Sequence, residues 1–107
     1  MSRTQSKLEA CAKEVQEAGI KAGKKTKTRI VANDWTKNFD GEAHKKMYDQ
    51  HLKDLDISIL CNNVGMATMG NFTEISPETV HNAITCNVYS TALMTHQVIQ
   101  SFKRRHQ

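Results

Sequence analysis

The 107-residue sequence is poor in residues that interrupt regular structure and in long apolar runs. It has one proline and five glycines, so its elements are predicted to be long. No apolar run reaches the roughly 20 residues of a membrane-spanning helix, and the polar residues 1–7 do not resemble a signal peptide. The length suits one small domain, and the 38% apolar content is above the range of disordered chains.

Disulfide and metal sites have little support in the sequence. Cys11, Cys61 and Cys86 are odd in number, far apart and set in apolar surroundings. This pattern predicts buried, reduced thiols in an intracellular protein. The five histidines have no metal-site spacing with the cysteines, so no metal centre is predicted.

The net charge of +4 is unevenly distributed. Lys103, Arg104 and Arg105 form one basic run, and the other contains Lys21, Lys24, Lys25, Lys27 and Arg29. Such runs contact nucleic acid or an anionic membrane, or they are a solvated loop and a helix end whose cations complement the dipole. No aromatic residue interleaves with the lysines, which argues against a nucleic-acid site.

Apolar spacing predicts two helices in the first half of the chain. The first covers residues 4–18, with Thr4 or Ser6 as its cap and Gly19 as its C-terminal stop. The second covers residues 41–55. Tyr48 and His51 lie on its apolar face, so they are expected to pack and not to catalyse.

A long final helix is predicted from Ser76-Pro77-Glu78, which supplies a cap, an N1 proline and an acid near the positive dipole end. Its expected buried face is Val80, Ile84, Val88, Ala92, Thr95, Val98, Ile99 and Phe102. Asn87 lies within that face. A buried amide needs partners, so Asn87 is either a structural bridge to a neighbouring strand or part of a polar site.

Two short apolar segments, residues 28–32 and 57–61, are predicted to be buried strands. The order helix, strand, helix, strand, helix predicts an α/β fold with a right-handed parallel βαβ unit. The expected fold class is a partial Rossmann-like doubly wound parallel sheet, with residues 1–107 as one partial dinucleotide-binding domain.

Polar residues follow both predicted strands, where open α/β sheets place ligands. Asp34 follows the first, either as a hydrogen-bond acceptor for a ligand or as a cap of the next turn. Asn62 and Asn63 follow the second and can satisfy backbone groups at a strand end. Gly65 lets a backbone or ligand approach closely.

Together these residues resemble the middle of a short-chain dehydrogenase/reductase. Asn62-Asn63-Val64-Gly65 resembles the family's Asn-Asn-Ala-Gly motif after the fourth strand. Asp34 matches the acidic residue after the third strand that contacts the cofactor adenine. Asn87 lies 25 residues beyond Asn62, at the place of the catalytic asparagine. Arg3 resembles an arginine that favours the 2′-phosphate of NADP(H).

The valine of the motif and the preceding Asp56-Ile57-Ser58-Ile59-Leu60 look closest to one branch of the family. It contains the 17β-hydroxysteroid dehydrogenases and the very-long-chain 3-oxoacyl-CoA reductases. The resemblance implies NADP(H), a ketone or secondary alcohol on a steroid or fatty-acyl substrate, and no nucleic-acid partner. It also implies a possible homo-oligomer in the intact relative, and an endoplasmic reticulum membrane or cytoplasmic location.

Two parts of the family pattern are missing from this sequence. There is no glycine-rich phosphate turn, whose helix N-terminus would bind the pyrophosphate. The Tyr-x-x-x-Lys pair is also absent, because Leu52 follows Tyr48 and Leu93 follows Tyr89 at that spacing. The chain is therefore interpreted as a central fragment of a reductase. The alternatives are a non-catalytic truncated product or interaction module, and a small basic nucleic-acid binder.

Overall fold

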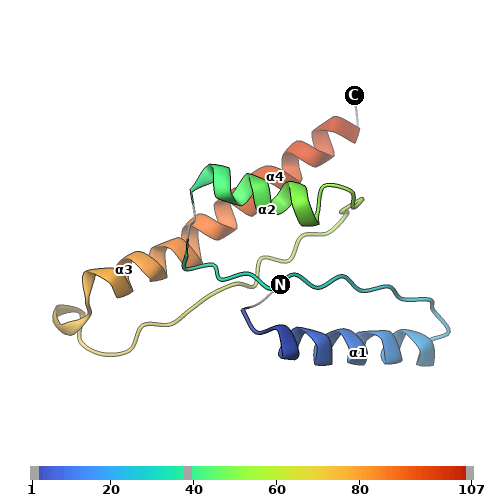
Figure 1. The fold of residues 1–107 in the computed structure, drawn as a ribbon, viewed down its shortest axis with the longest axis horizontal. Helices are drawn as coiled ribbons and strands as arrows, with labels where there is room; N and C mark the ends of the chain where they lie inside the picture. Colours follow the sequence, from blue (N-terminus) through green and yellow to red (C-terminus); the bar gives the residue numbers. More distant parts are fainter. Residues whose placement is uncertain (1–2, 38–39, 106–107) are drawn as a thin grey trace. The chain divides into compact units, whose positions relative to one another are not determined.

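The computed structural model describes residues 3–37 and 40–105. The chain divides into two compact units, Met1–Asp34 and Trp35–Gln107. The regular elements are α1 (Gln5–Lys21), α2 (Gly41–His51), the 3-10 helix η1 (Phe72–Glu74), α3 (Pro77–Ile84), the π-helix η2 (Thr85–Tyr89) and α4 (Ser90–Arg105) (Figure 1).

The predicted Rossmann-like parallel sheet is wrong for the described part of the chain. Residues 28–32 and 57–61 are extended, but apart from an isolated bridge at Ala32 no described residue belongs to a strand. The two segments belong to different compact units. Ile59, expected to be buried in a strand, is 87% exposed.

The strand order of doubly wound sheets explains this error. In the order 3-2-1-4-5-6, strands three and four are not neighbours, because strands two and one lie between them. In the resemblance stated from the sequence, residues 28–32 and 57–61 match strands three and four, which do not pair directly in this order. A strand forms only when a neighbour accepts and donates its ladder hydrogen bonds, and the described residues supply no such neighbour for residues 57–61.

The Met1–Asp34 unit is α1 followed by an extended segment that runs back beside it (Figure 1). The predicted helix is confirmed but continues to Lys21, past the expected stop at Gly19. Thr4 occupies the N-cap position without a side-chain cap hydrogen bond. The left-handed residue that follows the helix is Gly23, with φ of 68°.

In the Trp35–Gln107 unit, α2 begins at a capping carboxylate. Asp40 Oδ1 accepts a hydrogen bond from the Ala43 amide at 2.7 Å, which satisfies one of the free N–H groups of the first turn. The helix ends at His51, four residues before the predicted end. Leu52 and Lys53 both donate their backbone N–H to Tyr48 O. These bonds close the last turn, and the helix ends there.

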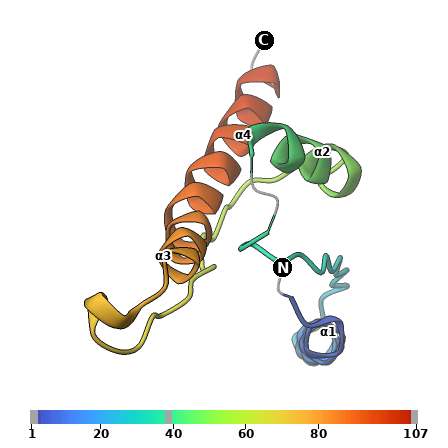
Figure 2. The same cartoon turned by 60° about the vertical axis from the view of Figure 1, so that its left-hand side comes forward.

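The predicted start of the final helix is confirmed. Ser76 Oγ accepts from the Thr79 amide at 3.2 Å, and Pro77 occupies the first turn. From Pro77 to Arg105 the backbone is helical throughout, through α3, η2 and α4. α2 packs across α4, and the extended segment 57–66 runs along α4 in both views (Figures 1 and 2).

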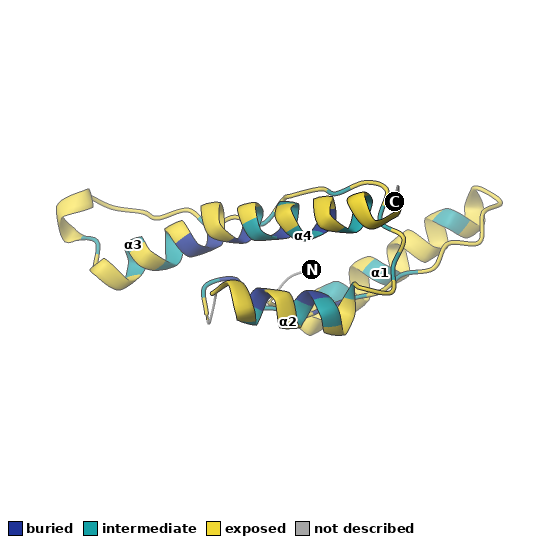
Figure 3. Cartoon of the chain, turned by 90° about the horizontal axis from the view of Figure 1, so that it is seen from above, coloured by how far each residue is buried: buried dark blue, intermediate teal, exposed yellow. Residues whose placement is uncertain are grey.

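The core of this unit lies between α2, α4 and residues 57–66. Its buried members are Trp35, Tyr48, Cys86, Met94 and Val98. Buried residues lie on the sides of α2 and α4 that face each other (Figure 3). The prediction that Tyr48 packs is confirmed, whereas His51 is exposed.

Two other burial predictions are partly wrong. Cys86 is buried, but Cys11 and Cys61 are exposed. Of the face expected to be buried on the final helix, Val98 is buried while Ile84, Val88, Ala92 and Ile99 are exposed. The π-helix adds a residue to one turn and rotates α3 relative to α4, so one stripe cannot run through both. The predicted buried face was also expected to pack on a sheet, and the described residues do not form one.

His44 is fully buried on α2, one turn before Tyr48, and no pattern in the sequence singles it out. Its ring lies 6.2 Å from that of Trp35, between centroids. Burial lowers the pKa of His44 below 6.5, because the charged imidazolium loses its hydration. The pKa of Asp49 on the same helix is also lowered, by its hydrogen bond from Lys45.

We expect acid to destabilise the Trp35–Gln107 unit through His44. Because the folded-state pKa is the lower one, the unfolded chain takes up the proton first, and stability is lost as pH falls below about 6.5. Thermal melts followed by fluorescence of the single tryptophan should show this loss. His44→Gln should weaken the pH dependence near 6.5, whereas the matched change His96→Gln, at an exposed position, should leave it intact.

Candidate functional site

Segment 57–66 is fastened to the final helix at three points. Arg105 Nη2 donates to Ile57 O at 2.6 Å, at the start of the segment. Asn62 Nδ2 donates to Thr95 Oγ1 at 2.9 Å. The end of the segment bonds to Asn87. These contacts hold the Asn62–Gly65 motif beside α4 without a sheet.

Asn87 makes a two-point bridge to the backbone just beyond the motif. Its Oδ1 accepts from the Met66 amide at 2.7 Å, and its Nδ2 donates to Met66 O at 2.9 Å. Both functions of the amide are used, so this side chain bonds to the N–H and the C=O of one residue, as a neighbouring strand does in an antiparallel pair. Of the two roles left open by the sequence, the structural bridge is the one that the geometry shows.

The bridge originates in a π-helix. Thr85–Tyr89 has Asn87 at its centre, and the Ser90 amide bonds back to Thr85 O, five residues earlier. Single π-turns inside α-helices are uncommon and often occur at functional sites. Inserting one residue here turns Asn87 toward Met66 while Cys86 and Ser90 remain buried. The sequence carried no signal for this turn.

The other residues of the motif lie close to this bridge. Asn63 and Gly65 are exposed. A Cβ added at Gly65 would lie 3.5 Å from Asn87 Oδ1, an ordinary van der Waals contact. The backbone of the isolated chain therefore does not require glycine here.

Arg3 and Asp34 belong to the other compact unit. Arg3 is exposed in front of α1, and Asp34 is partly buried at the end of the extended segment. The structure thus brings together Asn62, Gly65 and Asn87 within one unit. Asp34 and Arg3, which match the residues that contact the adenine and the 2′-phosphate, lie in the Met1–Asp34 unit.

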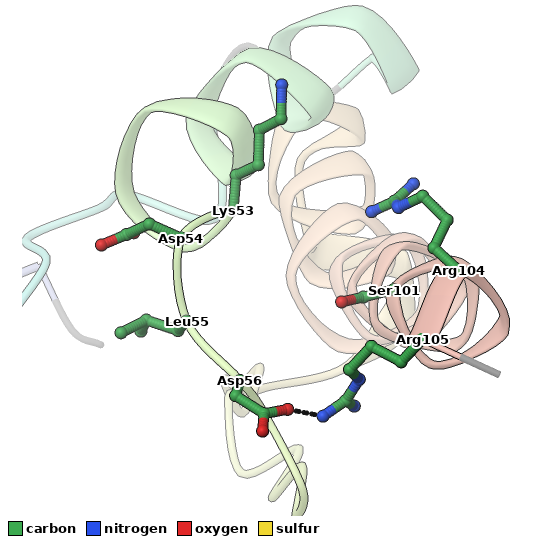
Figure 4. Close-up of a pocket in the computed structure, with 7 residues that line it drawn as sticks. All are labelled: Lys53, Asp54, Leu55, Asp56, Ser101, Arg104 and Arg105. Carbon is green, nitrogen blue, oxygen red and sulfur yellow. Dashed lines mark ion pairs between the residues drawn. The ribbon is translucent and has the colours of Figure 1, made fainter. Parts of the chain in front are cut away.

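A pocket of about 320 Å³ lies at the far end of the same unit, near the start of segment 57–66 (Figure 4). Arg105 spans it, forming an ion pair with Asp56 while its guanidinium lies 4.8 Å from the Phe102 ring centroid. None of the predicted site residues lines it; the lining residues are Lys53, Asp54, Leu55, Asp56, Ser101, Arg104 and Arg105. Arg105 therefore fastens the segment to α4, and the pocket is separate from the motif.

Residues 3–37 and 40–105 contain no group of three or more His, Cys, Asp or Glu side chains that could hold a metal ion. Within the same residues, no helix is both long and apolar enough to cross a membrane.

Comparison with known proteins identifies the family of the chain. A family model described as short chain dehydrogenase matches residues 1–107. The chain belongs to the short-chain dehydrogenase family. The resemblance stated from Asn62–Gly65, Asn87, Asp34 and Arg3 is therefore confirmed at the level of the family.

Curated members of the short-chain dehydrogenase family resemble the chain over its whole length. A very-long-chain 3-oxoacyl-CoA reductase of Schizosaccharomyces pombe is 33% identical over 100% of the chain. A 17-beta-hydroxysteroid dehydrogenase type 3 of Mus musculus is 36% identical over 98% of it. The chain spans only 30% and 32% of these two relatives. No solved structure gives a significant match.

Thr95 and Met66 are the site residues that the sequence argument did not identify. Thr95 lies eight residues after Asn87, about two helical turns, so both can face the same segment. That spacing was the signal available for Thr95. Met66 contributes only backbone groups, which no side-chain pattern can reveal.

Proposed function

We propose that this chain is the central part of an NADP(H)-dependent short-chain dehydrogenase that acts on a ketone or secondary alcohol of a fatty-acyl or steroid substrate. The observation that carries the proposal is the bridge from Asn87 to Met66 beside Asn62 and Gly65. The bridge places the Asn62–Gly65 motif next to Asn87, and these are the two most distinctive matches to the family in the sequence. Family membership and the names of the relatives supply the reaction class and the substrate class.

In this proposal Asn62 and Asn63 border the cofactor ribose, and Gly65 leaves space for it. Asn62 is already oriented, because its Nδ2 donates to Thr95. Asp34 accepts a hydrogen bond from the adenine amino group, and Arg3 neutralises the 2′-phosphate. Both are accessible enough for such contacts, since Arg3 is exposed and Asp34 is only partly buried.

Asn87 is proposed to hold the water of the proton relay through its backbone and not its side chain. Its side-chain oxygen and nitrogen are both bonded to Met66. A main-chain carbonyl has two lone pairs, and Thr91 Oγ1 donates to Asn87 O only at a long 3.4 Å. The carbonyl oxygen can therefore accept from a water that passes a proton toward the substrate oxygen. When bound, the cofactor supplies or accepts the hydride.

Catalysis also needs groups that this sequence does not contain. The glycine-rich turn binds the pyrophosphate, and the Tyr-x-x-x-Lys pair delivers the proton. We therefore propose that residues 1–107 taken alone do not catalyse the reaction, as for a truncated product or a part of a longer enzyme. The same comparison with relatives motivates a proposed intracellular location with endoplasmic reticulum association.

A chimaera tests the proposal directly. Residues 1–107 would replace the matching part of the S. pombe reductase, of which they span 30%. We expect NADPH-dependent reduction of a 3-oxoacyl-CoA. The Asn87→Ala variant keeps the carbonyl but loses the two bonds to Met66 that fix its position, so its kcat should be about 10- to 100-fold lower. Arg3→Ala should raise KM for NADPH and leave KM for NADH unchanged, because only NADPH carries the 2′-phosphate. Asn82→Ala, on the neighbouring α3, is the matched control and should keep full activity.

A folded chimaera without activity, with secondary structure checked by circular dichroism, would contradict the proposed reaction. NADPH binding by residues 1–107 alone in titration calorimetry would support the proposed cofactor contacts and contradict only the stated need for the glycine-rich turn.

A further inference from the structure

The turn after α1, residues 20–27, has a defined shape. We call it the α1 turn. The Gly23 amide donates to Ile20 O and the Lys24 amide donates to Gly19 O, each at 2.9 Å. Gly23 has a φ of 68°, which a residue with a side chain rarely adopts. The helix end is thereby closed by its own backbone, and the chain reverses within a few residues.

The extended segment that follows the α1 turn is bonded to and packed against the last turns of α1. Gln16 Nε2 donates to Thr28 Oγ1 at 2.7 Å. Thr26 packs directly on Gly19, where an added Cβ would lie 2.1 Å from Thr26 Oγ1. These contacts make a helix with a closely packed return (Figure 1). The α1 turn is therefore held out at the end of this hairpin.

The α1 turn combines one large apolar side chain with a group of cations. Ile20 is 74% exposed, although isoleucine is among the residues most often buried. All residues of the turn are exposed (Figure 3). Its cations are Lys21, Lys24, Lys25 and Lys27. An exposed apolar side chain in the same turn as four lysines suits a surface that is anionic outside and apolar beneath.

The charge of the chain is concentrated in this unit. Residues 1–34 contain eight Lys and Arg against four Asp and Glu, and residues 35–107 contain seven against seven. The whole net charge of +4 therefore belongs to the first unit. No acidic residue lies between Lys21 and Arg29. The field around the α1 turn is not locally neutralised by sequence neighbours.

The helix dipole accounts for only part of this pattern. Lys21 lies in the last turn of α1, where a cation complements the dipole. Lys24, Lys25 and Lys27 lie beyond the helix. A nucleic-acid surface would not use Ile20, and no aromatic residue stands among the lysines for base stacking.

We propose that the α1 turn is a docking surface for an anionic lipid membrane. The four lysines approach the lipid headgroups, and Ile20 enters the interfacial region. The charge complementarity and the exposed isoleucine identify the partner by its chemistry. The inference concerns the Met1–Asp34 unit and does not depend on the proposed catalytic role.

Flotation of the full 107-residue chain with lipid vesicles tests this surface, because aggregated protein sinks while lipid-bound protein rises. We expect binding to phosphatidylcholine vesicles with roughly one third phosphatidylserine, and little binding to phosphatidylcholine alone. Raising the salt from about 0.05 M to about 0.5 M should release the protein. The double variant Lys24→Glu/Lys25→Glu should lower partitioning by about tenfold or more, and Ile20→Ser by about threefold or more.

The matched control is Lys103→Glu/Arg104→Glu, which makes the same charge change in the other basic run. It should bind within about twofold of the unaltered chain. Equal binding to neutral vesicles, salt-independent binding, or an equal loss in the control would overturn the proposal. Binding to a DNA duplex without binding to anionic vesicles would also overturn it, in favour of a nucleic-acid surface.

Discussion

Tyr48→Ala is expected to unfold the Trp35–Gln107 unit at room temperature or close to it. Tyr48 is 1% exposed and lies in the small core between α2 and α4. Removing a buried aromatic ring costs about 3–5 kcal/mol through lost transfer energy and the cavity left behind. A unit of this size has a free energy of unfolding of about 4–10 kcal/mol. Because the buried core of this unit is small, its stability is expected near the lower end of that range, where the loss equals the whole free energy of unfolding.

Tryptophan fluorescence during urea unfolding measures this effect, since the single tryptophan, Trp35, is buried in the same core. Tyr48→Phe is the control. Among the described residues the buried Tyr48 hydroxyl has no hydrogen-bond partner, so its removal should leave stability unchanged or slightly raised. A large loss in Tyr48→Phe would show that the hydroxyl does bond within the folded unit.

Asn87→Ala should release segment 57–66 from the final helix at its motif end. Two hydrogen bonds to the Met66 backbone are lost, at about 1 kcal/mol each, and water can reach the exposed site and replace part of them. The change should lower the free energy of local opening at Met66 more than the free energy of global unfolding. Hydrogen exchange of the Met66 amide should accelerate about tenfold or more, because opening no longer breaks the Asn87 bond.

Asn87→Asp separates the two halves of the bridge. A carboxylate still accepts from the Met66 amide, but it has no N–H for Met66 O. Exchange at Met66 should therefore lie between that of the unaltered chain and that of Asn87→Ala. Asn63→Ala, at a nearby exposed position, should leave exchange at Met66 unchanged. If Asn63→Ala had the larger effect, the bridge would not be what holds the segment.

Local signals in the sequence predicted local structure well. Ser76-Pro77 fixed the start of α3, because a cap and an N1 proline act within one turn. Tyr48 was recognised as a packing residue from its place on an apolar stripe. The burial of His44 on the same face was not predicted, because histidine counts as a polar residue in a hydrophobicity pattern. Only the folded structure shows that Trp35 and α4 side chains cover that face.

The predicted sheet failed because strands are not local structures. Apolar residues 57–61 have the composition of a buried strand, but hydrogen bonding in a sheet requires neighbours from elsewhere in the chain. For the site, the sequence left two roles open for Asn87, a structural bridge or part of a polar site. The bridge could be identified only from the positions of its side chain and Met66 in the folded structure. The π-helix that orients Asn87 toward Met66 could not be predicted, because no residue pattern distinguishes this turn from the α-helix around it.

The partition of charge between the two units has a consequence for how the protein behaves as a colloid. The basic isoelectric point of about 9.1 describes the whole chain, whereas residues 35–107 taken alone balance their charges at seven of each sign. A protein without net charge loses the mutual repulsion that keeps molecules apart in solution. The lysines of the first unit therefore act as the solubilising group for the apolar surface of the second, and a proteolytic cut after Asp34 would leave that surface to precipitate near neutral pH.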